Sequence, residues 1–579
     1  MGTSNSTGNW DQQFDVVVVG SGAGGMTAAL CSQAQGLGVV VLEKTDRYGG
    51  TSAVSGGGIW IPCNEQMAAA GVPDSFGEAM TYMKHLTAGE VPQPRLEAYL
   101  RNAPEMVQFM ARMFGVRFRS VAKYPDYFPD QPGGKPGART MEPAEFDAAK
   151  LGAEFDRQRE PYKGTLVLGR IGMDQVEAHK LFGRAPGWVW LTIKLMWNYW
   201  TDFSWRKRTW RDRRQVLGQA LVSSLRHAML QKNIPLLYET ALESLVEDNG
   251  RVTGVVVRQN GVTRRIAARR GVILASGGFE SNQAMRDQYL PKPSEAAWSA
   301  APGINTGDGI RAGLELGAGL KFMNLVWGTP TVVIPGTKIA SALFVERSLP
   351  GCVMVNKAGQ RFCNEAAPYT EAVNAIYADH AKTGGTVPSW MVFDARFRKS
   401  YPCGPLLPAS IVPDTKLPAD WADKVYYKAD SLDALAAKIG VDAKGLAETV
   451  AKVNGFAATG VDTEFSKGGN AFERYYADPK VTPNPCLAPI TAAPFYALPI
   501  VPGEIGTKGG LVADERGRVL REDGSAIAGL YATGNCSAAV MGKTYAGPGA
   551  TLGPAMTFGY IAARDIASAA QAVPVRAAA

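Results

Sequence analysis

A buried strand followed by a glycine-rich turn begins the chain and limits its fold more than any other feature. Residues 14–19 are almost wholly apolar, which is typical of a strand covered on both faces of a parallel sheet. Gly20, Gly22 and Gly25 follow with the spacing G-x-G-x-x-G. The first glycine allows a tight turn, the second lets backbone approach a pyrophosphate, and the third lets the next helix pack closely. Residues 26–30 continue as that helix, whose N-terminal N–H groups and dipole attract phosphate.

The next strand and the acidic residue at its end complete the pattern. Residues 39–42 are apolar and lead into Glu43, roughly 20 residues after the glycines, where a carboxylate accepts hydrogen bonds from an adenosine ribose. Three glycines alone would also suit an ordinary tight turn. A dinucleotide site is predicted because the glycines follow a strand and are followed in order by a helix, a second strand and an acidic residue. The cofactor-binding residues expected here are Gly20, Gly22, Ala23, Gly24, Gly25, Glu43 and Lys44.

Two further glycine clusters, within residues 44–60, indicate which dinucleotide is bound. A simple nicotinamide-binding unit would enter another helix directly, whereas these glycines let extended backbone run against a large flat group. The stretch resembles the fumarate reductase and succinate dehydrogenase flavoprotein superfamily, in which it follows FAD from the pyrophosphate toward the isoalloxazine. The resemblance assigns cofactor contacts to Gly50, Thr51, Ser52, Gly56, Gly57 and Gly58. Covalently flavinylated members carry a histidine near the Thr-Ser position, but Ala53 follows Ser52 here, so we expect non-covalent FAD.

Two later strands are predicted to end beside the same cofactor, and the long segment between them suggests a second domain. Residues 271–276 end in Gly277 and Gly278, and residues 529–533 end in Gly534 and Asn535; the resemblance places both ends beside FAD. About 200 residues separate them, and 579 residues exceed one ordinary core. We therefore predict an α/β protein with a discontinuous Rossmann-type FAD-binding domain, residues 1–299 and 498–579. An α+β catalytic domain is expected to be inserted at 300–497.

Composition excludes several other classes. The seven cysteines form no C-x-x-C pair and the four histidines are dispersed, so no metal or iron–sulfur site is expected. The cysteine usage favours a reduced, cytoplasmic compartment, and residues 1–13 lack the apolar segment of a secretory signal. The net charge is +8, of which +7 comes from nine Lys or Arg and two Asp in residues 180–214. This concentration indicates a local anionic partner.

The same basic segment contains an amphipathic, tryptophan-rich helix. Six of the twelve tryptophans lie between 188 and 210, and positions 189, 190, 193, 196, 197, 200 and 203 form one apolar stripe. Lys194 interrupts the stretch, which is shorter than the roughly 18–20 apolar residues that span a bilayer. Because tryptophan favours the lipid headgroup region and the cations attract anionic lipid, we predict a membrane-associating insertion at about 160–214. Residues 181–212 would be an in-plane anchor of a peripheral membrane protein. A buried helix or an oligomer contact is the alternative.

Three tyrosine-containing motifs point to a narrower family. Tyr127 lies in the proline-containing stretch 124–129, Tyr369 ends the motif Arg-Phe-Cys-Asn-Glu-Ala-Ala-Pro-Tyr, and Tyr545 lies in the glycine-rich stretch 542–556. With the flavin pattern, these motifs resemble the 3-ketosteroid Δ1-dehydrogenases over nearly the whole chain. Residues 160–213 are the exception, and a membrane-associated subclass carries a comparable insertion.

The resemblance implies a substrate, an acceptor and a set of roles. The substrate would be a 3-ketosteroid that loses a hydride from C1 to flavin N5 and a proton from C2, and a quinone-like acceptor would receive the electrons. Tyr369 would take the proton, assisted by Tyr127, although Tyr124 lies close enough in sequence to be the assisting residue instead. The Tyr545 hydroxyl and the Gly549 N–H would polarise the 3-keto oxygen, which ionisation next to a carbonyl requires. The same motif adds two cofactor-binding positions, Ala550 and Leu552.

Other functions are weighed against this one. Fumarate reductase-like sites commonly carry a histidine in the turn after the third flavin strand, but residues 536–542 contain none. The related Δ4-(5α)-dehydrogenases carry a serine shortly after the tyrosine, whereas Tyr545 is followed by Ala-Gly-Pro-Gly. A non-catalytic flavin carrier would not need the tyrosine motifs. Nucleic-acid binding is not expected, because the basic cluster accompanies a tryptophan helix rather than a known binding module.

Overall fold

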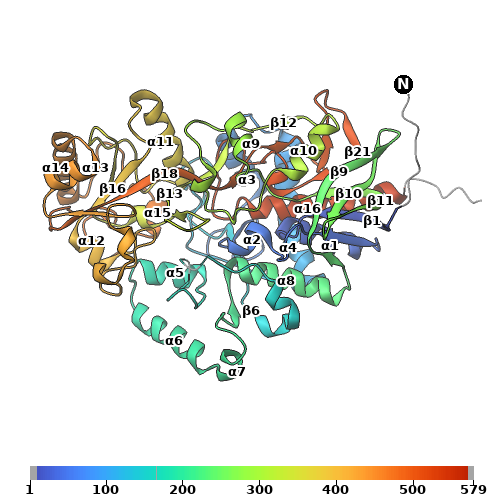
Figure 1. The fold of residues 1–579 in the computed structure, drawn as a ribbon, viewed down its shortest axis with the longest axis horizontal. Helices are drawn as coiled ribbons and strands as arrows, with labels where there is room; N and C mark the ends of the chain where they lie inside the picture. The colour runs from blue at the N-terminus through green and yellow to red at the C-terminus, as the bar shows by residue number, and fades with distance from the viewer. Residues whose placement is uncertain (1–9, 163, 165, 572–579) are drawn as a thin grey trace, which may run out of the picture.

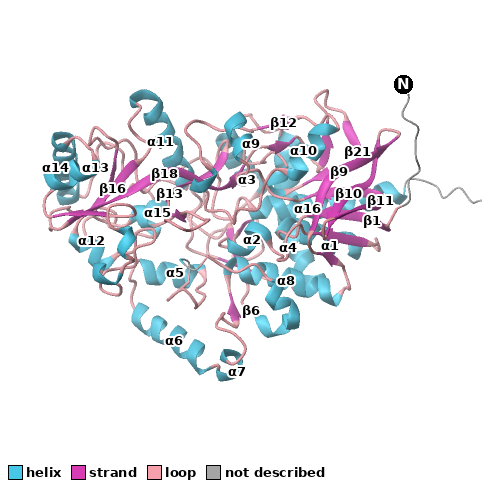
Figure 2. Ribbon diagram, in the orientation of Figure 1, coloured by secondary structure: helices cyan, strands magenta, loops and turns pink. Residues whose placement is uncertain are grey.

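An eight-stranded sheet forms the core of the cofactor-binding half of the computed structural model, which describes residues 10–162, 164 and 166–571 (Figures 1 and 2). The order is β20-β21-β10-β11-β1-β2-β8, and β9 pairs with β10. Its strands are β1 (Gln12–Val19), β2 (Val39–Leu42), β8 (Leu236–Leu237), β9 (Thr240–Asp248), β10 (Arg251–Gln259), β11 (Val262–Leu274), β20 (Arg518–Leu520) and β21 (Ala526–Ala532). Strands β8, β2, β1, β11 and β21 run parallel to their neighbours in that series. The predicted α/β, Rossmann-type architecture is confirmed.

Helices cover both faces of this sheet, which explains why β1 is apolar throughout. Val16 and Val18 pack with residues of α1, α8 and α16, whereas Val17 and Val19 pack with residues of β10, β11 and α10 on the opposite face. The helices of this half are α1 (Ala23–Ala34), α2 (Gly50–Val54), α3 (Phe76–Thr87), α4 (Gln93–Phe114), α8 (Leu217–Gln231), α9 (Gln283–Tyr289), α10 (Asp308–Glu315) and α16 (Leu552–Gln571). Short strands complete it, namely β3 (Ile59–Trp60), β4 (Phe118–Ser120), β5 (Thr140–Pro143), β6 (Phe146–Asp147), β7 (Arg214–Gln215), β12 (Leu320–Lys321) and β19 (Gly510–Leu511).

An antiparallel sheet with order β14-β13-β18-β16-β15 organises the inserted half, and β17 pairs with β18. The strands are β13 (Val326–Val332), β14 (Ser341–Ala342), β15 (Cys352–Val355), β16 (Ser389–Phe393), β17 (Tyr427–Ala429) and β18 (Phe495–Thr507). The helices are α11 (Tyr369–Thr383), α12 (Ala395–Ser400), α13 (Leu432–Ile439), α14 (Ala443–Thr459) and α15 (Ala471–Tyr475). Strand β18 crosses the expected boundary at residue 497, because its hydrogen-bonded partners β13 and β16 belong to the inserted half. Residues Ile310 and Ala312 of α10, beyond the expected boundary at 300, lie in the core of the first sheet.

The tryptophan-rich insertion extends away from both sheets, along the lower edge of Figure 1. It contains α5 (Gln175–Phe182), α6 (Trp188–Thr201) and α7 (Phe203–Arg206). Trp190, Trp197 and Phe203 of the predicted stripe are 75%, 69% and 71% exposed, while Leu195 and Tyr199 point inward and are buried. The stripe therefore faces outward rather than into the core. Among the described residues, no helix combines the length and apolarity that crossing a membrane requires.

Close backbone packing at the first turn makes two of its glycines obligatory. Gly20 has φ +109°, and a Cβ on it would lie 2.4 Å from the carbonyl oxygen of Ala275. A Cβ on Gly25 would lie 2.1 Å from the carbonyl oxygen of Gly20, so α1 can approach β1 only without a side chain there.

We predict that Gly25→Ala abolishes retention of the cofactor, because α1 must move away from the end of β1. Gly77→Ala is the matched control, since a Cβ at exposed Gly77 meets nothing within 4 Å. The flavin absorbance per purified chain measures the effect. A full flavin content in Gly25→Ala would contradict the packing argument.

Candidate active site

Three tyrosines from distant parts of the chain meet in one buried cluster. The Tyr127 hydroxyl donates a hydrogen bond of 2.7 Å to the Tyr369 hydroxyl oxygen. The Tyr545 ring lies 5.0 Å from the Tyr127 ring and 5.6 Å from the Tyr369 ring, measured between centroids. All three side chains are at least nine-tenths buried. The sequence-predicted tyrosines therefore come together between the two halves of the molecule.

The structure also distinguishes between Tyr124 and Tyr127, the two candidates for the residue that assists Tyr369. Tyr124 stacks on Tyr475 with a centroid distance of 4.6 Å and meets Tyr476 edge-on at 5.6 Å. Tyr127, by contrast, contacts both Tyr369 and Tyr545. Of the pair, Tyr127 is thus the one hydrogen-bonded to Tyr369.

Burial determines the protonation of the cluster. Loss of hydration raises the pKa of Tyr127 and of Tyr369 well above the ordinary value, and it raises the pKa of Tyr545 as well. For Tyr369 the hydrogen bond from Tyr127 acts in the opposite direction and lowers the pKa. The three phenols are therefore neutral near pH 7, and Tyr127 is the group that favours ionisation of Tyr369.

The turn that carries Tyr545 and Gly549 is fixed by contacts with the N-terminal part of the chain. The carbonyl oxygen of Ala546 accepts hydrogen bonds from the Tyr82 hydroxyl at 2.7 Å and from the Tyr127 N–H at 3.1 Å. Gly549 has φ +93°, and a Cβ on it would lie 2.6 Å from backbone atoms of Gly58 and Ile59. Only glycine fits at position 549, and its backbone is thereby held against the second glycine cluster.

A buried lysine that sequence reasoning missed supports the same turn. The Lys508 ammonium donates to the carbonyl oxygens of Lys543 at 2.9 Å and Thr544 at 2.6 Å, directly before Tyr545. It also lies 4.6 Å from the Trp327 ring centroid, and that ring packs against Tyr545 at 4.7 Å. Burial lowers the pKa of Lys508 to about 7. In the sequence, the only sign that Lys508 has a structural role is its position among the glycines of residues 506–510.

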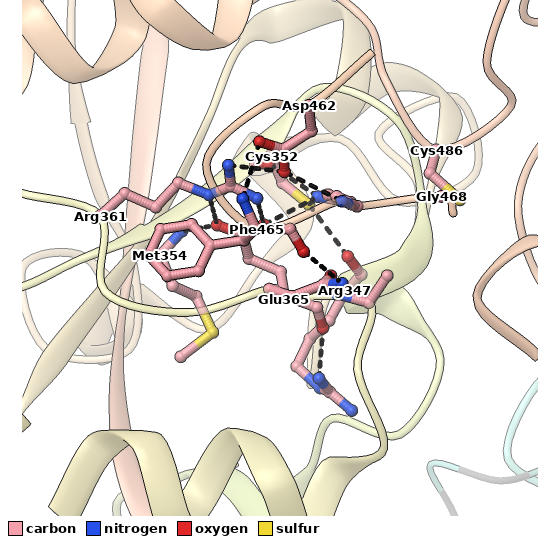
Figure 3. Close-up of polar contacts among 12 residues, drawn as sticks. Arg347, Cys352, Met354, Arg361, Glu365, Asp462, Phe465, Gly468 and Cys486 are labelled. Carbon is pink, nitrogen blue, oxygen red and sulfur yellow. Dashed lines mark hydrogen bonds and ion pairs between the residues drawn. The ribbon is translucent and has the colours of Figure 1, made fainter. Parts of the chain in front are cut away.

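A buried ion cluster supports the segment that leads into Tyr369 (Figure 3). Arg361 pairs with Glu365 through two hydrogen bonds of 2.8 Å and with Asp462 at 2.8 Å, while the Lys467 ammonium lies 3.3 Å from Glu365. Although burial opposes ionisation, the charges of Arg361 and Lys467 lower the pKa of Glu365 to about 2. Arg347 donates to the backbone carbonyl oxygens of Glu365 and Ala367, just before α11 begins. These contacts fix the position from which Tyr369 projects.

The predicted cofactor-binding residues of the first half lie around the N-terminus of α1. The Ser52 hydroxyl accepts the Ala23 N–H at 3.0 Å, and the Glu43 carboxylate accepts the Ser21 hydroxyl and the Thr45 N–H. A Cβ built on Gly22 would meet only the Ser52 hydroxyl oxygen, at 3.4 Å, and one on Gly56 would meet nothing within 4 Å. Backbone that is open at these positions fits the approach of a large ligand such as FAD.

Other predicted cofactor positions have additional packing contacts. Lys44 forms an ion pair of 2.7 Å with Asp308, and the Thr51 hydroxyl accepts a hydrogen bond from the Asn305 amide. A Cβ on Gly24 would lie 2.9 Å from the Ala555 carbonyl oxygen, so Gly24 permits packing of α1 against α16. Gly57 packs against the backbone of Leu217 and Gly218, whereas Gly277 and Gly278 pack against the side chains of Asn305 and Thr507. A Cβ on Gly58 would lie 2.8 Å from the Gln175 side-chain amide, and one on Gly50 would meet only the Gly22 backbone, at 3.9 Å. Gly534, Asn535 and Ala550 line a small pocket beside Trp327, and Leu552 begins α16.

Comparisons with known proteins show the family of the chain. A family model described as an FAD binding domain matches residues 15–552. A 3-oxosteroid 1-dehydrogenase of Mycolicibacterium smegmatis is 43% identical, over 97% of this chain and 98% of that protein. The chain belongs to the 3-oxosteroid 1-dehydrogenase family. FAD is accordingly its cofactor, and it is an FAD-dependent dehydrogenase.

Two solved structures are similar to this chain. The 3-ketosteroid Δ1-dehydrogenase of Sterolibacterium denitrificans, in complex with 1,4-androstadiene-3,17-dione, is 51% identical with a TM-score of 0.94, covering 96% of this chain and 100% of that chain. The 3-ketosteroid Δ4-(5α)-dehydrogenase of Rhodococcus jostii is 21% identical with a TM-score of 0.65, covering 97% and 98%. The second likeness shows a shared fold alone.

We predict a pH-dependent stability difference between the wild type and Lys508→Met. The folded chain binds fewer protons than the unfolded chain between the folded pKa of about 7 and the ordinary value of 10.5. The Lys508 contribution to the unfolding free energy therefore rises with pH across this window and is constant below it. Urea unfolding of both proteins at pH 6, 8 and 9.5 measures the difference, which a pH-independent offset would contradict.

Proposed function

We propose that this enzyme introduces the C1–C2 double bond into 3-ketosteroids, with Tyr369 as the base and Tyr545 and Gly549 as the oxygen-binding pair. The observation that carries the proposal is the buried tyrosine cluster, formed by the three motifs that resemble those of the family. The androstadienedione complex of the S. denitrificans enzyme supports a steroid as the substrate. FAD, when bound, supplies the acceptor for the hydride.

The residues of the chain account for the remaining chemistry. The Tyr545 phenol keeps its proton, because burial raises its pKa, so it can donate a hydrogen bond to the 3-keto oxygen. Gly549 presents a backbone N–H without a side chain that would obstruct approach. Tyr369 accepts the C2 proton, and the hydrogen bond from Tyr127 stabilises the phenolate that a base requires. Burial excludes water that would compete for these bonds.

The second part of the proposal concerns location and electron transfer. The outward-facing stripe of α6 and α7 and the exposed cations Lys194 and Lys207 support peripheral attachment to an anionic membrane surface on the cytoplasmic side. A membrane-bound enzyme that collects two electrons per turnover suits a quinone-like acceptor dissolved in that membrane.

We predict that Tyr369→Phe lowers turnover by about 10²–10⁴-fold, since it removes the proton acceptor. Tyr545→Phe should lower it by about 10²–10³-fold through loss of one donor to the carbonyl oxygen. Tyr124→Phe is the matched control, because Tyr124 packs outside the cluster, and it should retain activity within a few-fold. The measurement is product analysis with a 3-keto-4-ene steroid and an artificial acceptor, without air. All three variants should keep FAD, and an active Tyr369→Phe would exclude Tyr369 as the base.

For the anchor, we predict that replacing Trp190, Trp197 and Phe203 together by serine abolishes flotation with anionic phospholipid vesicles. The control replaces three exposed apolar residues elsewhere, Leu314, Ile411 and Val461, by serine. The control should float like the wild type, and both variants should retain steroid turnover in detergent. Equal flotation of all three proteins would reject the membrane role of this face.

A further inference from the structure

A cavity of about 300 Å³ lies between α2 and the insertion. Its wall is largely apolar and includes Ala53, Val54, Leu166, Met173, Trp210 and Val216. None of the residues that line it belongs to the cluster of Tyr127, Tyr369 and Tyr545. The volume is at the lower limit of pockets that bind small organic ligands. The cavity is thus separate from the site proposed for the steroid.

One wall of the cavity belongs to the cofactor-binding segment. Ala53 and Val54 end α2, directly after Ser52, whose hydroxyl accepts the N–H of Ala23 at the start of α1. The Gln219 side-chain amide donates to the Ala53 carbonyl oxygen at 2.7 Å, and a Cβ on Gly218 would lie 2.2 Å from the Ser52 carbonyl oxygen. This wall is therefore held rigidly against the residues that fit FAD.

The opposite side of the cavity reaches the exposed aromatic face. Trp210 lines the cavity and is 56% exposed, and its ring lies 6.0 Å from that of Trp200 on α6. The Arg170 guanidinium lies 4.9 Å from the Trp210 ring centroid, which places N–H donors beside an aromatic surface. A flat ring with carbonyl oxygens would match this combination of apolar wall, aromatic rim and cationic donor.

We propose that this cavity binds the head group of a lipid-soluble quinone, which enters from the membrane beside Trp210 and reoxidises the reduced cofactor. The quinone gains two electrons from the reduced cofactor and two protons from solvent and leaves as a quinol, while the cofactor releases its proton and returns to its oxidised state. The inference rests on the proposed function, because steroid desaturation supplies the two electrons. It assigns the two half-reactions to different faces of the molecule, so that steroid and acceptor do not compete for one pocket.

The test fills the cavity from the side of the insertion. Met173→Trp and Leu166→Trp each add side-chain volume at a residue that lines the cavity. Met113→Trp is the matched control, because it is also a Met-to-Trp change but lies on the exposed face of α4. Calorimetric titration of the oxidised holoenzyme with decylubiquinone measures binding directly. We expect the two cavity variants to weaken binding by about tenfold or more, equivalent to 1.4 kcal/mol, and Met113→Trp to leave binding unchanged.

Half-reactions measured by anaerobic stopped flow separate the possible outcomes. In the cavity variants, flavin bleaching by the steroid and reoxidation by ferricyanide should stay within about twofold of wild type, whereas reoxidation by decylubiquinone should slow about tenfold. Unchanged quinone binding in the cavity variants would overturn the proposal. If bleaching of the flavin by the steroid were also slower in these variants, the cavity would be a passage for the steroid instead. A wild type that the steroid does not bleach would refute the proposed function, while the binding titration would still test the cavity.

Discussion

The hydrogen bond between the Tyr127 and Tyr369 hydroxyls joins the two halves of the molecule at the point where the chemistry is placed. Tyr127 comes from the N-terminal part of the chain and Tyr369 from the first turn of α11 in the inserted half. In a buried environment such a bond is strong, and an unpaired phenol would be costly, so the bond also favours one relative position of the two halves. The ring of Tyr545, supplied by the C-terminal segment, completes the cluster only when those halves are docked.

Two buried cationic systems support the backbone segments that carry Tyr545 and Tyr369. Lys508 draws together the carbonyl oxygens that precede Tyr545, and Arg361, Glu365 and Lys467 order the segment that precedes Tyr369. Burying these charges is expensive, so their contribution is better understood as fixing one conformation than as adding stability. Both systems act on residues that shortly precede each tyrosine, because Lys508 binds the carbonyl oxygens of Lys543 and Thr544, and Glu365 lies four residues before Tyr369.

The insertion carries the two features on which the proposals about the membrane and the electron acceptor rest. Its outward aromatic face and basic residues suit a membrane interface, and its inner side closes a cavity against α2. A single segment of the chain therefore forms both the proposed attachment to the membrane and the wall of the proposed acceptor site. Under the two proposals, an apolar acceptor would approach the cofactor from lipid without crossing water.

The sequence by itself determined the cofactor half and the character of the insertion. Strand β1, the turn at Gly20 and helix α1 are local features, and the two-sided burial of β1 follows directly from its unbroken apolar run. The apolar stripe of α6 could be predicted because helical periodicity depends only on residues that are close together in sequence. The tyrosine motifs and the superfamily resemblance then narrowed the chemistry to one family, which the comparisons confirm.

Only the tertiary structure decided which side chains meet. Tyr124 and Tyr127 lie in the same short stretch of sequence, so the sequence does not distinguish their roles. Tyr124 stacks on Tyr475 and Tyr127 is hydrogen-bonded to Tyr369, and both partners lie more than 200 residues away. The local sequence around Lys508 does not reveal which groups it binds, because its carbonyl partners lie in a turn some 35 residues further on. Strand β18 continues past the expected boundary at residue 497, since its ends are set by pairing with β13 and β16 and not by its own composition. Local patterns specify elements, whereas contacts between distant segments specify the site.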